Sequence, residues 1–141
     1  MKILAVDYGT KRIGLAVSDA LGVLASPRPA LVGVGDKQAA AAIVKLTRDE
    51  ACELVLLGLP RNMDGSYGES AGMVRAFAAR LEPQLGVLLK LVDERLTTVQ
   101  ASRLLHEQGL NTRKQRQRID SASAAVLLQG YLDAQAPAPE F

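Results

Sequence analysis

Three short apolar runs constrain the fold of this chain more than any other feature of its sequence. They span residues 3–6, 53–59 and 87–92, and each is apolar on both faces when it is read as a β-strand. A helix-length segment precedes the second run and another precedes the third, which is typical of parallel βαβ connections. The sequence therefore predicts an α/β fold in which these three strands are buried from both sides.

Two further strands are expected beside the first. After a turn at residues 8–11, residues 12–18 read as a strand that returns antiparallel to the first one. Pro27 and Pro29 favour an edge position for a strand within residues 23–32, because proline cannot donate a hydrogen bond to a sheet ladder. The predicted sheet is therefore mixed and has five strands.

Apolar positions at helical spacing predict helices that cover both faces of this sheet. Asp36 is expected to cap the first helix, and Pro83 is expected to stop the second. The predicted helices span residues 36–50, residues 69–81, a segment from Thr97 or Thr98 to Gly109, and residues 119–133.

The length and composition indicate one ordinary globular domain. We expect it to span residues 1–134 of the 141, with a mobile tail at residues 135–141. Hydrophobic residues make up 48% and charged residues 23%, which argues against a disordered chain. No apolar run approaches the roughly 20 residues that span a bilayer, so no membrane association is expected. Cys52 is the only cysteine, which excludes an internal disulfide and fits a reducing cytoplasm.

Carboxylates stand at the ends of two predicted strands and at the start of the last helix. Asp7 ends the first strand, Asp93 and Glu94 end the last strand, and Asp120 opens the closing helix. Sites in open α/β sheets form outside strand ends, so three of these acids could meet at one edge of the sheet. A site made of oxygen ligands alone can bind Mg²⁺ or Mn²⁺, and such a cation would remove the repulsion between the acids. Two such ions about 4 Å apart would activate a water and stabilise the leaving oxygen of a phosphodiester.

Each acid also has a simpler interpretation when it is taken alone. Asp7 can cap the turn that follows it, Asp120 can cap the helix, and Asp93 and Glu94 can form surface salt bridges. Strand alternation points Asp93 and Glu94 to opposite faces of the sheet. Either acid could therefore be the metal ligand, and Glu94 has the longer reach.

Basic side chains lie close to the candidate acids in the sequence. Residues 111–118 carry four of them, with no acid among them, directly before Asp120. Such a run is either an ordinary solvated loop or a segment that contacts phosphates. The candidate nucleic-acid-binding residues are Lys11, Arg12, Arg61, Arg95, Arg113, Lys114, Arg116 and Arg118.

Four motifs follow one another over nearly the whole chain: DYGTKRIGLAVSD, LVLLGLPRNMDGS, VDERLTT and IDSASAAVLLQGYL. Together they resemble the YqgF/RuvX family of the RNase H-like superfamily, which is related to RuvC-type Holliday junction resolvases. The resemblance implies an RNase H-like fold and metal-binding carboxylates at Asp7, Glu94 and Asp120, with Asp93 as the alternative to Glu94. Resolvase-type relatives place the second acid after the fourth strand, where this chain has Gly58-Leu59-Pro60.

These features together predict a metal-dependent endonuclease that acts on structured nucleic acid. The resemblance implies two substrates, the 5′ end of precursor 16S ribosomal RNA or branched DNA such as Holliday junctions. A non-catalytic nucleic-acid scaffold is the main alternative, and the presence of all three acids argues against it. An actin-like ATPase needs two such domains around its nucleotide, and 141 residues supply only one. We expect Mg²⁺ or Mn²⁺ with two ions per site, nucleic acid as partner and a cytoplasmic location; a homodimer is left open.

Overall fold

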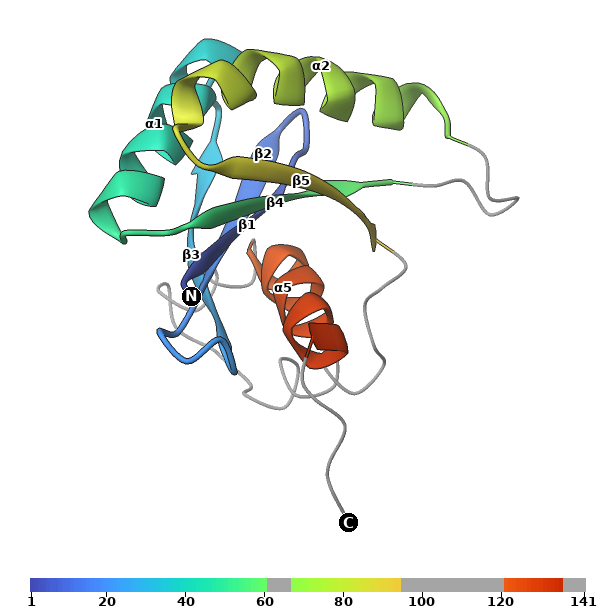
Figure 1. Cartoon of the computed structure of the whole chain (residues 1–141). Helices are drawn as coiled ribbons and strands as arrows, with labels where there is room; N and C mark the ends of the chain where they lie inside the picture. Colours follow the sequence, from blue (N-terminus) through green and yellow to red (C-terminus); the bar gives the residue numbers. More distant parts are fainter. Residues whose placement is uncertain (61–66, 95–120, 136–141) are drawn as a thin grey trace, which may run out of the picture.

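A mixed sheet of five strands lies at the centre of the structure, a computed structural model that describes residues 1–60, 67–94 and 121–135 (Figure 1). The strands are β1 Ile3–Asp7, β2 Arg12–Ser18, β3 Ala25–Val32, β4 Leu54–Leu59 and β5 Leu88–Asp93. They are ordered β3-β2-β1-β4-β5 across the sheet. β1, β4 and β5 are parallel, whereas β2 pairs antiparallel with both β1 and β3. The predicted five-stranded mixed sheet is confirmed. The prediction that residues 87–92 form a strand buried from both sides is wrong, because β5 lies at an edge of the sheet, with Leu88 69% and Leu91 38% exposed.

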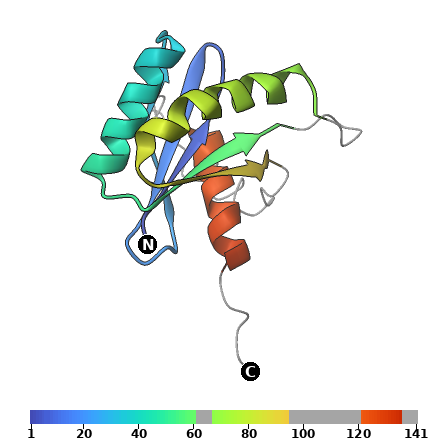
Figure 2. The same ribbon diagram turned by 45° about the horizontal axis from the view of Figure 1, so that its top comes forward.

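Helices cover both faces of the sheet, as expected. α1 Asp36–Asp49 and α2 Glu69–Leu85 lie on one face, and α5 Ala122–Gln135 crosses the other (Figure 2). The predicted helix between Thr97 or Thr98 and Gly109 lies outside the described residues. Among the residues that the structure describes, no helix is both long and apolar enough to cross a membrane.

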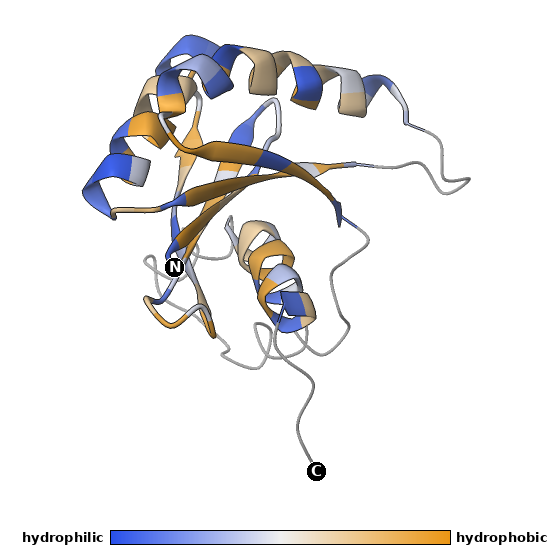
Figure 3. Ribbon diagram, in the orientation of Figure 1, coloured by the Kyte–Doolittle hydropathy of each residue, from blue (hydrophilic) through white to orange (hydrophobic). Residues whose placement is uncertain are grey.

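Strand alternation divides the core into two layers. Leu4 and Val6 of β1 point into the layer beneath α1 and α2, while Ile3 and Ala5 point into the layer beneath α5. Figure 3 shows the apolar central strands between these helices, whose ribbons mix hydrophilic and hydrophobic residues. Because the next residue of β1 is Asp7, the same alternation directs its side chain to the face that α5 covers.

The prediction that Pro83 stops the second helix is wrong. α2 continues through Pro83 to Leu85 and ends at Gly86, which has a left-handed φ of 70°. Proline in the last turn costs α2 one backbone hydrogen bond, since its nitrogen carries no hydrogen. Leu85 is buried in the core and anchors that last turn, so packing outweighs the lost bond.

Two other helix boundaries also differ from the prediction. Gly35, not Asp36, is the N-cap of α1, and Asp36 is the first residue of the helix. The Asp36 carboxylate accepts a hydrogen bond from the Tyr8 hydroxyl at 2.9 Å, so it serves a tertiary contact instead of capping. α5 extends to Gln135, two residues beyond the predicted end at Asp133, and no glycine or proline lies in that last turn to stop it.

Candidate functional site

The carboxyl ends of the three parallel strands meet at one edge of the sheet. Asp7 is the last residue of β1, Gly58 is next to last in β4, and Glu94 directly follows β5. Val92 of β5 packs in the layer beneath α5, so alternation places Glu94 on the same face as Asp7. Alternation places Asp93 on the opposite face, as expected from the sequence.

Tyr8 and Gly9 fix the chain directly after Asp7. The Tyr8 ring stacks on Phe77 of α2, with ring centroids 4.7 Å apart, on the face opposite to Asp7. A Cβ atom at Gly9 would lie 2.6 Å from the backbone oxygen of Arg12, so only glycine allows this tight turn. These two contacts therefore fix the backbone that directly follows Asp7 at the edge of the sheet.

Glu94 reaches Asp7 by passing over β4. Neighbouring strands lie about 4.8 Å apart, so the backbones of β1 and β5 are about 10 Å apart with β4 between them. A Cβ atom on Gly58 of β4 would lie 3.1 Å from Glu94 Oε1 and 3.2 Å from Glu94 Cγ. The Glu94 side chain therefore lies directly over Gly58, where a larger residue would obstruct it.

The Asp7 and Glu94 carboxyl groups form a hydrogen bond with each other. Two carboxylates cannot share such a bond unless one of them carries a proton. Burial raises the pKa of Asp7, and the hydrogen bond with Glu94 partly offsets that rise. Burial, and next the Asp7 charge, raise the pKa of Glu94 to about 7. The pair thus bears a proton near neutral pH that a bound cation would displace.

The donor set fits a divalent cation with a preference for oxygen ligands. Two half-buried carboxylates in contact supply oxygen donors and an excess negative charge that Mg²⁺ or Mn²⁺ would neutralise. Among residues 1–60, 67–94 and 121–135, no group of three His, Cys, Asp or Glu side chains is placed to hold a metal ion. The third predicted ligand, Asp120, lies outside the described residues.

The metal-free pair is expected to make stability depend on pH. The folded pKa of Glu94, about 7, exceeds its ordinary value of 4.5, so the folded chain binds this proton more tightly than the unfolded chain. The stabilisation is fully present below about pH 4.5 and is lost as the pH rises through about 7. Thermal melts in EDTA should show the Tm of wild type falling relative to that of Glu94→Gln over this range. A constant difference between the two Tm values would contradict the raised pKa.

Gly58→Ala is expected to weaken the site without unfolding the sheet. The added Cβ would lie 3.1 Å from both Glu94 Oε1 and Leu127 Cδ2, so it would press the carboxylate away from Asp7 and also press on α5. Loss of outer contacts to metal ligands typically costs 10- to 100-fold, so we expect Mn²⁺ affinity and cleavage to fall by about 10-fold. Gly72→Ala in α2 is the matched control, since nothing lies within 4 Å of its added Cβ. Equal cleavage by the two variants would show that Gly58 does not limit the position of Glu94.

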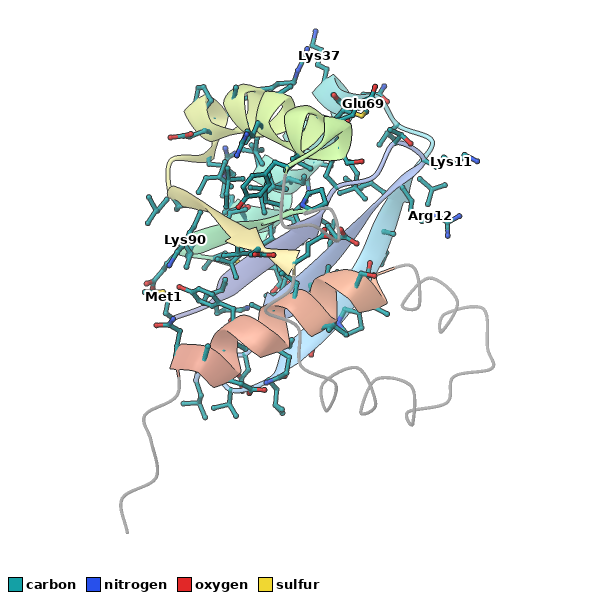
Figure 4. The ribbon with its side chains drawn as sticks, turned by 90° about the vertical axis from the view of Figure 1, so that its right-hand side faces the viewer. Met1, Lys11, Arg12, Lys37, Glu69 and Lys90 are labelled. Atoms are coloured by element: carbon teal, nitrogen blue, oxygen red, sulfur yellow. The ribbon has the colours of Figure 1, made fainter. Side chains whose placement is uncertain are left out.

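The basic candidates divide into two described residues and six others. Lys11 and Arg12 are exposed at the turn between β1 and β2. Figure 4 shows both side chains projecting outward, at the far end of the molecule from Met1. The candidates that lie outside the described residues are Arg61, Arg95, Arg113, Lys114, Arg116 and Arg118.

Two contributors to the site were not predicted from the sequence. Gly58 interrupts an otherwise apolar strand, and an isolated glycine in a strand is a recognised sign of a close approach. Ser121 lies in a small-sided helix turn, but its hydroxyl is fully buried and bonds to the backbones of two strands. No local sequence signal specifies those partners, because they are residues of distant β2 and β3.

Comparisons with known proteins agree with this fold. The family model RuvX, described as "Holliday junction resolvase", matches residues 1–134. A "Putative pre-16S rRNA nuclease" of Anaeromyxobacter dehalogenans (strain 2CP-C) is 44% identical over 137 residues, which cover 97% of this chain and 100% of that protein. A Moorella thermoacetica protein of the same name is 45% identical over 133 residues, covering 94% of this chain and 95% of that protein.

A solved structure extends the likeness to the fold. T. thermophilus RuvC, solved in complex with a Holliday junction substrate, superposes with a TM-score of 0.58 at 12% identity, covering 96% of each chain. At that identity the match shows a shared RNase H-like fold. The family match spans all of the described residues except the last, and the chain therefore belongs to the RuvX family and is a nuclease.

Proposed function

We propose that Asp7, Glu94 and Asp120 together bind Mg²⁺ or Mn²⁺, with two ions per site, and that the chain hydrolyses phosphodiester bonds in structured nucleic acid. The observation that carries this proposal is the contact between the half-buried carboxyl groups of Asp7 and Glu94. Such a pair is costly unless a proton or a cation neutralises it. Strand ends place it at the sheet edge, where a third ligand can join it.

The residues of the chain divide the work of the reaction. When bound, the metal supplies an activated water and stabilises the leaving oxygen of the phosphodiester. Asp7 and Glu94 provide carboxylate oxygens from rigid strands, and Glu94 releases its proton on binding because the charged form is needed. Asp93 takes no part as a ligand, since it lies on the opposite face of the sheet.

The basic side chains are proposed to position the substrate. Lys11 and Arg12 extend from the turn that follows Asp7, within the same hairpin, and can contact phosphates beside the scissile bond. Arg61, Arg95, Arg113, Lys114, Arg116 and Arg118 are proposed to contribute further phosphate contacts. We place the reaction in the cytoplasm, which the single cysteine favours, and a homodimer stays a prediction.

The substrate is proposed to be either precursor 16S ribosomal RNA or a four-way DNA junction. The names of the relatives from A. dehalogenans and M. thermoacetica favour the RNA, and the substrate of T. thermophilus RuvC favours the junction. Cleavage of a labelled pre-16S fragment and a labelled junction should be compared side by side in Mg²⁺, Mn²⁺ and EDTA. A linear duplex of the same arm sequence is the control.

We expect metal-dependent cleavage of at least one structured substrate, little cleavage of the linear duplex and none in EDTA. Binding of both substrates without cleavage in either metal would instead favour a non-catalytic scaffold. Cleavage that persists in EDTA would contradict the role of the carboxylates as metal ligands.

A further inference from the structure

The hydroxyl of Ser121 is inserted between two strands of the sheet. Its Oγ accepts a hydrogen bond from the Leu15 backbone N–H at 3.1 Å and donates one to the Arg28 carbonyl at 2.5 Å. Leu15 and Arg28 are opposite each other in the β2–β3 ladder, where a direct bond between them would otherwise form. Ser121 itself is 0% exposed and directly precedes α5.

A β-bulge provides the place for this hydroxyl. The register between β2 and β3 shifts between Ile13 and Leu15, which opens the ladder beside Gly14. Pro27 and Pro29 of β3 flank Arg28 and lack donors of their own, so the ladder is sparse here. The side chain of Ser121 thus satisfies a buried N–H and a carbonyl that the bulge separates.

The bulge lies next to the candidate metal ligand Asp7. Gly14, the residue before Leu15, is the direct partner of Asp7 in the antiparallel β1–β2 pair. Strand alternation directs Gly14, like Asp7, to the face that α5 covers. Ser121 is therefore fixed one residue along β2 from the partner of Asp7.

A second polar side chain, Gln129, attaches the middle of α5 to the backbone around the start of β3. Gln129 Oε1 accepts from the Ala25 N–H at 3.0 Å, and its Nε2 donates to the Val23 carbonyl at 2.8 Å. Gln129 follows Ser121 by eight residues, or about two helical turns, so it lies farther from the site along α5. The two side chains make comparable bonds to backbone, but only Ser121 makes them beside Asp7.

We propose that Ser121 is a positioning residue for the cleavage reaction, whose hydroxyl locks the start of α5 into the β2–β3 bulge beside Asp7. This inference rests on the proposed function, in which Asp120 is the third metal ligand. Leu15 directly follows Gly14, the partner of Asp7, so the lock on Ser121 also restrains the backbone beside the Asp7 carboxylate. A ligand set needs such support, because a metal site loosened by an ångström loses most of its activity.

Ser121→Ala and Gln129→Ala separate positioning from stability. Both remove backbone hydrogen bonds from α5, so both should lower the Tm by several degrees. Only Ser121→Ala should raise the Kd for Mn²⁺, measured by calorimetry, and lower kcat, each by about 10-fold or more. KM should stay within about twofold of wild type in both variants, because the phosphate contacts remain.

Each outcome decides between the inference and its alternatives. An unchanged Kd and kcat in Ser121→Ala would overturn the inference and leave a purely structural serine, with the proposed function intact. Asp7→Asn verifies that Mn²⁺ reports the carboxylate site, and a wild-type protein that binds no Mn²⁺ would overturn both proposals. Equal losses of kcat in Ser121→Ala and Gln129→Ala would also overturn the inference. They would show that cleavage depends on the attachment of α5 to the sheet in general and not on the position of Ser121.

Hydrogen exchange keeps the inference testable if Ser121→Ala does not fold. In wild-type protein, Mg²⁺ should slow exchange of the Leu15 amide by at least about threefold more than that of Val17, because the lock and the metal site stabilise each other. Val17 lies in the same strand and pairs directly with Ser26 of β3. Equal slowing of both amides would show that the hydroxyl is not coupled to the metal.

Discussion

Asp7→Asn is expected to lower cleavage by well over about 100-fold while leaving the fold intact. Loss of a residue that merely supports a ligand costs 10- to 100-fold in metal affinity or activity, so the loss of a ligand should cost more. The change is nearly isosteric, and it removes one of two like charges that lie half-buried against each other. In EDTA at pH 8 the Tm of the variant should therefore equal or exceed that of wild type. Single-turnover cleavage and thermal melts measure the two effects.

Asp49→Asn is the matched control for Asp7→Asn. Asp49 forms an exposed ion pair with Lys45 at 2.8 Å in α1, so the same chemical change there should leave cleavage unaltered and cost little stability. An Asp7→Asn variant that cleaves at the wild-type rate in Mg²⁺ and in Mn²⁺ would show that the site is misassigned. A marked loss of Tm in that variant would instead mean that the Asp7 charge is structurally required.

The sheet could be predicted from the sequence because its signal is local. The runs around Val6 and Leu57 are apolar on both faces and form strands that are buried from both sides, whereas the run around Val92 forms the largely exposed edge strand β5. Helix ends were predicted less well because tertiary contacts decide them. α2 continues through Pro83 because Leu85 in the same last turn is buried. Asp36 does not cap α1, because its carboxylate accepts a hydrogen bond from Tyr8.

The contact between Asp7 and Glu94 was only partly predictable. Alternation and strand ends bring both acids to one face and one edge of the sheet, and the sequence shows these. The strand order is not local information, and it places β4 between the two carboxylates. The sequence shows that the strand ends in Gly58-Leu59-Pro60, without an acid. It does not show that the lack of a side chain at Gly58 leaves room for Glu94 to reach Asp7.

In the proposed site, that geometry explains how a carboxylate on β5 can serve as a ligand where this chain has none on β4. A ligand on β4 would start beside Asp7, whereas a ligand on β5 must cross one more strand spacing of about 4.8 Å. Glutamate has one more methylene than aspartate and so gains reach, and a glycine on β4 removes the obstacle. The longer acid after β5 can thus reach the site only because β4 has a glycine at the crossing point. This arrangement predicts that substitutions of Asp93 and Glu94 have different effects on cleavage.

Glu94→Gln should be inactive, whereas Asp93→Asn should retain cleavage within about threefold of wild type. Both substitutions remove one negative charge from adjacent residues, so they change the net charge and the local field almost equally. They differ in direction, because Glu94 lies over Gly58 in contact with Asp7, and Asp93 points to the other face of the sheet. We expect Glu94→Gln to lower cleavage by more than about 100-fold, as for the loss of any metal ligand. Single-turnover rates at pH 8 with saturating Mn²⁺ provide the comparison.

The Kd for Mn²⁺ separates ligand loss from a general electrostatic effect in these two variants. It should rise sharply for Glu94→Gln and little for Asp93→Asn, and the Tm of each variant in EDTA shows whether it is folded at the assay temperature. The reverse order of rates would make Asp93 the ligand, and it would mean that β5 presents its carboxyl end with the opposite alternation. Similar moderate losses in both would mean that the two acids act through net charge alone, because a residue that binds the metal directly cannot be replaced as harmlessly as its neighbour on the other face.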